Sequence, residues 1–185
     1  MTAWLKRQSA WLGLVLCLWL GLAWADGFSV QRVHTYLAQD VYRLDADLKL
    51  EFSPASLEAM RNGVPLTLEL EMRVRQVRDW VWDEDLAHVV QRYRLEYHAL
   101  SGQYLLVNLN SSTRQSYPTL GMATDRIARI RDFPLLDRSL LQTKQLYYGE
   151  LRIKLDIESL PAPLRPLAYI SSDWWLSSEW YRWAL

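Results

Sequence analysis

The stretch LTLELEMRVR, from Leu66 to Arg75, alternates apolar and polar side chains without a break. Successive side chains of a β-strand point to opposite faces, so this pattern predicts a strand with one apolar and one charged face. We expect the apolar side, including Leu70, to be buried. We expect the charged side, including Glu71, to meet solvent, so that Glu71 could be truncated at little cost.

The same period of two recurs from Tyr42 to Phe52, from Tyr93 to Ala99 and from Leu151 to Glu158. Strands with one apolar and one charged face are typical of antiparallel sheets that expose one face to solvent. Gln39-Asp40 and Ser101-Gly102 are short turn sequences between such stretches and predict hairpins. The sequence therefore predicts an all-β fold, a two-layer antiparallel immunoglobulin-like sandwich of about seven strands.

One or two short helices are expected to interrupt the strands. Ser53-Pro54 supplies an N-cap and a proline at the first helical position, and Asn62-Gly63 ends that helix. Apolar residues from Leu120 to Ile130 follow helical spacing, and we expect Phe133-Pro134 to end this second helix. A further short helix is expected between residues 135 and 145.

The N-terminus has the three parts of an export signal. Lys6 and Arg7 are followed by an apolar stretch from Ala10 to Leu22, and Ala23-Trp24-Ala25 fits a signal peptidase site. A permanent membrane helix needs about 20 apolar residues, which this stretch does not reach. We expect cleavage after Ala25 and a single domain over residues 26–185, with a retained anchor as the alternative.

The cysteine content and the net charge of the processed chain indicate its compartment and restrict its possible partners. The only cysteine of the full sequence, Cys17, lies in the export signal, so the processed chain would contain no disulfide. It would carry 19 basic and 21 acidic residues, a net charge of −2 that gives no electrostatic basis for binding nucleic acid. Export without disulfides favours the bacterial periplasm.

The histidines do not form a predicted metal site. His88 and His98 would lie about 33 Å apart on a straight strand, too far to share an ion. We expect His34 to be a half-buried histidine beside Phe28, Val30 and Tyr36. The acidic run 83–85 lacks the glycine and the ligand spacing of a calcium loop, so a solvated turn is favoured.

No other motif indicates an enzyme or a cofactor. The hydroxyl runs 111–113 and 171–173 have no histidine or lysine partner at a recognisable spacing, so we interpret them as turns and caps. The sequence contains neither a glycine-rich phosphate loop nor a CxxC pair. We expect no catalytic residue, no metal and no cofactor, while a site assembled from distant residues stays open.

The C-terminus is rich in tryptophan, with Trp174, Trp175, Trp180 and Trp183 in the last twelve residues. If residues 174–180 form a final strand, Trp174, Leu176 and Trp180 share its inner face. Trp175, Tyr181 and Trp183 would then face outward. These three aromatic residues are the candidate interaction patch, because large rigid rings bury much area at a low entropic cost.

A proline-rich segment, LPAPLRPLAY from Leu160 to Tyr169, precedes these tryptophans. Its three prolines remove three backbone donors, so it cannot be a central strand. An exposed polyproline segment can serve as a recognition ligand. Its leucines and tyrosine instead favour packing onto the domain.

The C-terminal half resembles a known family. Asp132-Phe133-Pro134-Leu135, the segment LRPLAY at 164–169 and the pattern WxLSSxWYxW at 174–183 resemble an exported proteobacterial family of unknown function. The resemblance implies a signal peptide followed by one such domain and an association with two-component sensor kinases. It supplies no catalytic residues.

Together these features predict a periplasmic, non-catalytic binding or accessory module. Its expected partner is another envelope protein, reached through a sheet edge or the aromatic C-terminus. The alternative is a glycan- or lipid-contacting module that uses the C-terminal tryptophans, with peripheral contact to a membrane and no transmembrane span after processing.

The export signal generates a direct prediction. Because the apolar stretch is short and the cleavage motif is complete, the protein should be recovered with Asp26 as its first residue, in the soluble periplasmic fraction. Intact-mass analysis of the exported protein measures this. Retention of residues 1–25 in a membrane pellet would contradict it.

Overall fold

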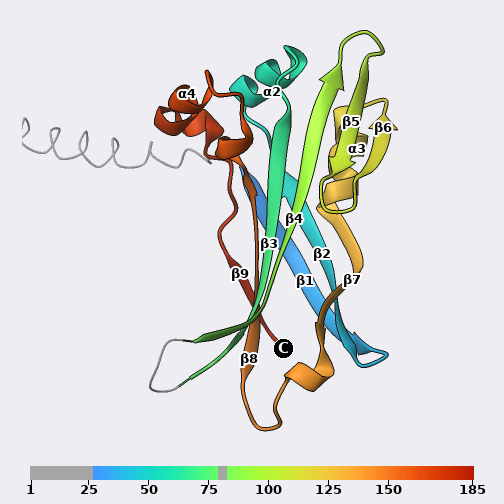
Figure 1. The fold of residues 1–185 in the computed structure, drawn as a ribbon, viewed down its shortest axis with the longest axis vertical. Helices are drawn as coiled ribbons and strands as arrows, with labels where there is room; N and C mark the ends of the chain where they lie inside the picture. The colour runs from blue at the N-terminus through green and yellow to red at the C-terminus, as the bar shows by residue number, and fades with distance from the viewer. Residues whose placement is uncertain (1–26, 79–82) are drawn as a thin grey trace, which may run out of the picture.

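Two antiparallel sheets lie face to face in the computed structural model, which describes residues 27–78 and 83–185 (Figure 1). The smaller sheet has the strand order β1-β2-β7, and the larger sheet has the order β6-β5-β4-β3-β8-β9. The fold is a β-sandwich, so the predicted fold class is confirmed. The export signal and its cleavage site lie outside the described residues.

Nine strands and six short helical segments make up the described chain. The strands are β1 (Phe28–Ala38), β2 (Val41–Leu50), β3 (Leu66–Gln76), β4 (Glu84–His98), β5 (Gln103–Asn108), β6 (Thr113–Tyr117), β7 (Arg129–Asp137), β8 (Tyr147–Leu155) and β9 (Tyr181–Ala184). The α-helices are α2 (Pro54–Arg61), α3 (Leu120–Ala128) and α4 (Arg165–Ile170). The 3-10 helices are η1 (Arg138–Leu140), η2 (Ile157–Ser159) and η3 (Ser172–Trp174).

The predicted turns and first helix form for the expected reasons. Gln39 and Asp40 both have positive φ angles, of 52° and 61°, which suits a two-residue hairpin turn between β1 and β2. At the start of α2, the Ser53 side chain accepts a hydrogen bond from the backbone N–H of Ser56, and Pro54 occupies the first helical turn.

The second helix is shorter than predicted. It ends at Ala128, and the chain continues directly as β7, which includes Phe133 and Pro134. Pro134 is tolerated because β7 is an edge strand of its sheet. Only the 3-10 turn η1 follows it, so the further helix expected over 135–145 is limited to three residues.

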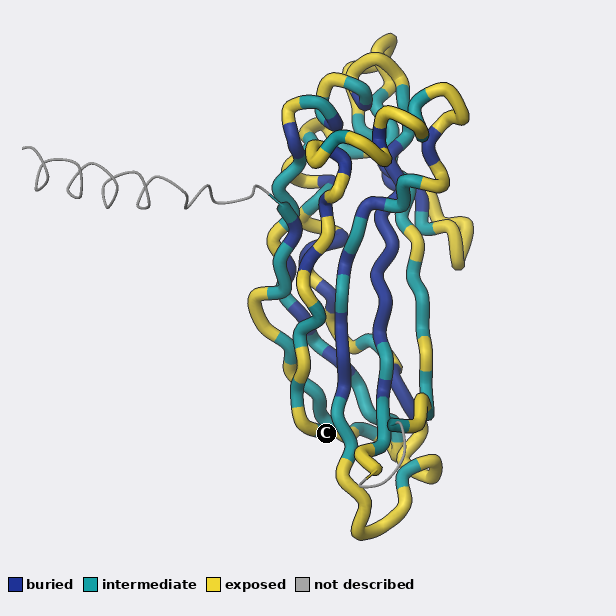
Figure 2. Tube along the Cα trace, turned by 90° about the vertical axis from the view of Figure 1, so that its left-hand side faces the viewer, coloured by how far each residue is buried: buried dark blue, intermediate teal, exposed yellow. Residues whose placement is uncertain are grey.

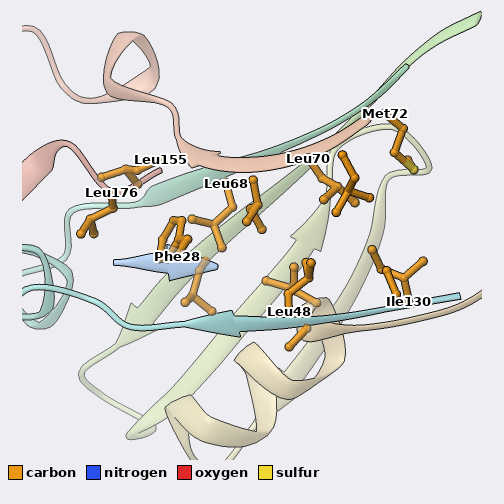
Figure 3. Packing of buried hydrophobic residues seen from close by; sticks show 14 of the residues in the cluster. Phe28, Leu48, Leu68, Leu70, Met72, Ile130, Leu155 and Leu176 are labelled. Carbon is orange, nitrogen blue, oxygen red and sulfur yellow. The ribbon is translucent and has the colours of Figure 1, made fainter. Parts of the chain in front are cut away.

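The core lies between the two sheets, with β3 at its centre. Leu68, Leu70 and Met72 are almost completely buried, as are Ile153 and Leu155 on β8. Figure 3 shows Leu68, Leu70 and Met72 facing Leu48 and Ile130 of the smaller sheet. In Figure 2 the buried tracts follow the long strands, while the loops at both ends are exposed.

A β-bulge changes the facing of β1. Val30 pairs with Leu48, but the next pair is Arg32 with Asp47, so Gln31 is an extra residue. A one-residue shift moves each later side chain to the other face. His34 is therefore exposed on the outside, stacked on Tyr36 with ring centroids 6.0 Å apart, and its predicted half-buried position is wrong.

The outer face of the larger sheet is also covered, contrary to the sequence-based expectation. Glu71 is only 4% exposed, and Glu69 and Glu150 are buried as well. Glu71 Oε1 lies 2.7 Å from both Arg152 Nη2 and Lys154 Nζ, and its Oε2 lies 3.1 Å from Arg73 Nη2. The carboxylates are thus buried under the long side chains of their own cationic partners.

Trp180 completes this cover. Its ring lies 4.4 Å from the guanidinium carbons of both Arg73 and Arg152, in cation–π contact with each. Neighbouring pairs extend the network, with Arg92 and Lys154 on Glu69 and with Arg182 on Glu150. We call this set of side chains on β3, β4, β8 and the C-terminal segment the outer ion-pair network.

Leu70→Ala should lower the free energy of unfolding by about 2 to 5 kcal/mol, because it removes buried methyl groups and leaves a cavity. Leu100→Ala is the matched control, since Leu100 is fully exposed in a turn, and should stay within about 0.5 kcal/mol. Urea unfolding measures both values. Equal losses in the two variants would contradict the placement of β3.

Glu71 makes stability depend on acid pH. Burial raises the pKa of Glu71, but the hydrogen bonds from Lys154 and Arg152 outweigh burial and lower that pKa from 4.5 to about 2. Its stabilising contribution is therefore complete above about pH 4.5 and is lost as pH falls towards 2. Glu71→Gln should unfold more easily at neutral pH and show a flatter pH dependence between these values.

Glu71→Ala should cost about 2 to 3 kcal/mol at neutral pH, because it leaves Arg73 and Arg152 partly buried without their carboxylate partner, while Lys154 keeps Glu69. This value replaces the small cost expected from the sequence. Urea unfolding at several pH values tests both variants. A Glu71→Ala cost below about 0.5 kcal/mol would show that the outer ion-pair network adds no stability.

Candidate functional site

The chain between β8 and β9 forms a cap at one end of the sandwich. After β8 it turns through η2, passes the prolines and forms α4 and η3, with η3 packed against α2 (Figure 1). The prolines stop a strand from continuing, and Pro166 lies in the first turn of α4, where its missing N–H costs nothing. The segment packs onto the domain through Leu160 and Ala168, but Leu167 and Tyr169, which were expected to pack inward, are exposed.

This cap has a buried and an exposed side. Leu160, Ala168, Trp174 and Leu176 are buried and join the core. Four large apolar side chains remain in solvent. They are Leu167 at 51% exposure, Tyr169 at 50%, Ile170 at 82% and Trp175 at 63%, and we call them the apolar cap.

Hydrogen bonds hold the apolar cap in place. The indole Nε1 of Trp175 donates to the carbonyl oxygen of Ala168 at 3.1 Å, which fixes the ring beside α4. The Tyr169 hydroxyl donates to Glu158 on η2. Arg165 Nε donates to the carbonyl oxygen of Leu160 at 2.8 Å. The side chains of Trp175, Tyr169 and Arg165 are therefore ordered before a partner binds, which lowers the entropic cost of binding.

A shallow groove of about 320 Å³ runs beside Trp175. Its lining is mostly apolar. The lining residues are Lys154, Leu155, Ile157, Tyr169, Trp174, Trp175, Leu176 and Ser177. Two members of the apolar cap, Tyr169 and Trp175, thus form part of its wall.

The C-terminal segment changes register along β8. Ser177 pairs with Lys154, whereas Tyr181 pairs with Leu151, so the segment advances four residues while β8 advances three. The extra residue reverses the facing of all that follows. Leu176 points inward, but Trp180 lies on the outside over Arg73 and Arg152, so its predicted place in the core is wrong.

The same shift separates the members of the predicted interaction patch. Tyr181 pairs with the fully buried Leu151, and Trp183 pairs with Gly149, which places both on the inner side of β9. A Cβ atom on Gly149 would lie 2.1 Å from the Trp183 ring, so this close approach requires glycine. Of the three residues, only Trp175 belongs to the apolar cap; Tyr181 and Trp183 lie on β9, towards the other end of the molecule (Figure 1).

The other three members of the apolar cap were not predicted from the sequence. Leu167 and Tyr169 lie in the segment 160–169, whose leucines and tyrosine were expected to pack inward, and Ile170 follows directly after it. A six-residue helix buries only one side, here through Ala168. The sequence feature that could have indicated this exposure is Ala168, a single small residue among large apolar neighbours.

Asp83 and Asp85 are engaged by neighbouring side chains, and His88 and His98 each lie near a glutamate. Asp83 accepts from Tyr148, and Asp85 pairs with Arg75 at 2.5 Å. His88 lies 3.8 Å from Glu71, and His98 lies 3.9 Å from Glu96. Over residues 27–78 and 83–185, no group of three or more metal-ligating side chains is placed to hold an ion.

No helix in the described part of the chain is both long and apolar enough to cross a membrane. Neither the curated proteins nor the solved structures gave a match to this chain. A family model does match, over residues 25–184, which is almost all of the chain after the expected signal. The chain therefore belongs to the family described as Domain of unknown function (DUF4390).

Proposed function

We propose that this protein is a non-catalytic binding module of the bacterial cell envelope that acts in the periplasm. Its partner is another envelope protein, which places an apolar segment on the apolar cap. The observation that carries the proposal is the exposure of four large apolar side chains on one short stretch of chain, of which Ile170 is 82% exposed. Contiguous exposed apolar patches are a mark of interaction surfaces.

The geometry favours a protein partner. Trp175 and Tyr169 stand beside a groove of about 320 Å³, so an inserted side chain would bury the faces of two aromatic rings. Tryptophan and tyrosine are frequent among the residues that dominate binding energy, especially when a pocket lies next to them. The hydrogen bonds of Trp175 and Tyr169 order these rings before binding.

The charges near the apolar cap argue against a membrane surface. Anionic lipid attracts clusters of lysine and arginine. Here Lys154 is already paired with Glu69 and Glu71, and the two carboxylates of Glu158 and Asp173 outnumber the cation Arg165 beside the cap. This border fits a partner segment with basic residues next to its apolar ones.

The test places a photocrosslinking amino acid at Ile170 in one version of the full chain and at Leu100 in a control, since both side chains are highly exposed. We expect the Ile170 version to crosslink one envelope protein and the Leu100 version not to do so. Trp175→Ala should reduce that crosslink and weaken binding of the purified partner about tenfold or more, without changing the melting temperature.

Two results would contradict the proposal. The first is crosslinking of the same proteins with equal yield from Ile170 and Leu100. The second is crosslinking from Ile170 to lipid or glycan alone, which would instead support a lipid- or glycan-contacting module.

A further inference from the structure

A separate small pocket lies between α3 and the strands β4, β5 and β6, on the inner face of the larger sheet. Its volume is about 140 Å³. It is lined by Tyr93, Leu106, Asn108, Ser111, Thr113, Gln115 and Arg126. It shares no residue with the groove beside Trp175.

The sheet register explains why this pocket is polar. Directly paired residues share a face, and one row of pairs runs from Leu68 through Tyr93 and Asn108 to Thr113. The row begins in the apolar core and ends in hydrogen-bonding side chains. The inner face of the larger sheet therefore changes from apolar to polar between β3 and β6, where the smaller sheet no longer covers it.

The pocket presents hydrogen-bond donors. Asn108 Oδ1 already accepts from the backbone N–H groups of Asn110 and Ser111, so its Nδ2 remains as a donor. Gln115 Oε1 accepts from the Tyr117 hydroxyl at 2.6 Å, which leaves Nε2 of Gln115. The hydroxyl groups of Ser111 and Thr113 bond each other at 2.8 Å, and one proton of that pair is free to donate.

Arg126 and Tyr93 add a positive charge and a hydroxyl. Arg126 is on the last turn of α3, and its acidic neighbour Asp125 pairs instead with Arg129 at 3.1 Å. Tyr93 and Arg126 line the same pocket. Burial raises the pKa of Tyr93, and the charge of Arg126 acts on that pKa in the opposite direction. Within the described part of the chain, no acidic residue lines this pocket.

We propose that this pocket binds a small oxyanion, a carboxylate or a phosphate group, held by Arg126 and by the Asn108, Gln115 and Tyr93 donors. A convergent set of donors without a carboxylate is complementary to negative charge, and hydrogen bonds to an ionised acceptor are about twice as strong as neutral ones. A space of roughly 150 Å³ holds a molecule the size of benzene, so the pocket admits a single such group.

The test is an NMR titration of the full-length protein, labelled with ¹⁵N, with sodium phosphate and, separately, with sodium acetate. Sodium chloride keeps the ionic strength constant. Saturable shifts of the Asn108 and Gln115 side-chain amide signals are expected with at least one anion. The anion that binds more tightly identifies the class of ligand.

Two matched variants of α3 decide whether the pocket is responsible. Arg126→Gln removes the charge that lines the pocket, and Arg129→Gln removes an exposed charge three residues away. Arg126→Gln should weaken binding about tenfold to hundredfold, and Arg129→Gln should leave it within about twofold. Tyr93→Phe should also weaken binding, because it removes one donor.

Either of two other outcomes would overturn the proposal. The absence of a saturable shift with both anions would show that the pocket takes no oxyanion. Equal weakening by Arg126→Gln and Arg129→Gln would show that the anions respond to the general charge of α3. Circular dichroism of each variant confirms that the fold is retained.

Discussion

The structure depends on a central strand, β3, that is buried on both faces. Its inner side chains, Leu68, Leu70 and Met72, fill the space between the two sheets. Its outer carboxylates, Glu69 and Glu71, are buried beneath cations supplied by β4, β8 and β3 itself. Taking a carboxylate out of water is costly unless its hydrogen-bonding capacity is filled, so this outer layer is stable only with all its partners in place. β3 therefore has an apolar layer on its inner side, between the two sheets, and an ionic layer on its outer side.

This outer layer also fixes the C-terminal segment. Trp180 lies over Arg73 and Arg152, and Arg182 pairs with Glu150, so the segment that leaves the apolar cap is attached to β8 by ionic as well as backbone contacts. On the inner side, Trp183 fits against Gly149. These contacts follow Trp175 in the chain by only a few residues. The position of the proposed binding surface is thus coupled to the network on β3.

The pocket under α3 lies on the other side of the sheet centre and depends instead on the register of β4, β5 and β6.

Much of the fold follows from the period of two. It predicted β2, β3, β8 and the second half of β4, and it predicted that Leu70 faces inward, while the turns at Gln39-Asp40 and Ser101-Gly102 predicted the hairpins that β1 and β5 complete. It failed where an extra residue enters a strand, because parity then reverses: His34 on β1 and Trp180 before β9 were both assigned to the wrong face. It missed β6, whose sequence TRQSY has no apolar alternation and which forms by pairing with β5. It also missed β7, where Ile127 and Ile130 keep a helical spacing across the boundary between α3 and the strand.

The burial of Glu71 was not predictable, because its partners come from strands distant in sequence. The apolar cap was anticipated only through Trp175.

We predict that the outer ion-pair network and Trp180 hold the C-terminal segment on β8. Amide hydrogen exchange of Trp180→Ala, compared with the unsubstituted protein, tests this most directly, since local opening is resolved residue by residue. The amides of residues 181–184 should exchange faster in the variant, together with their partners on β8, while the amides paired between β1 and β2 should be unchanged. Exchange at residues 181–184 that is unaffected by Trp180→Ala would contradict the claim, as would a uniform acceleration in both sheets.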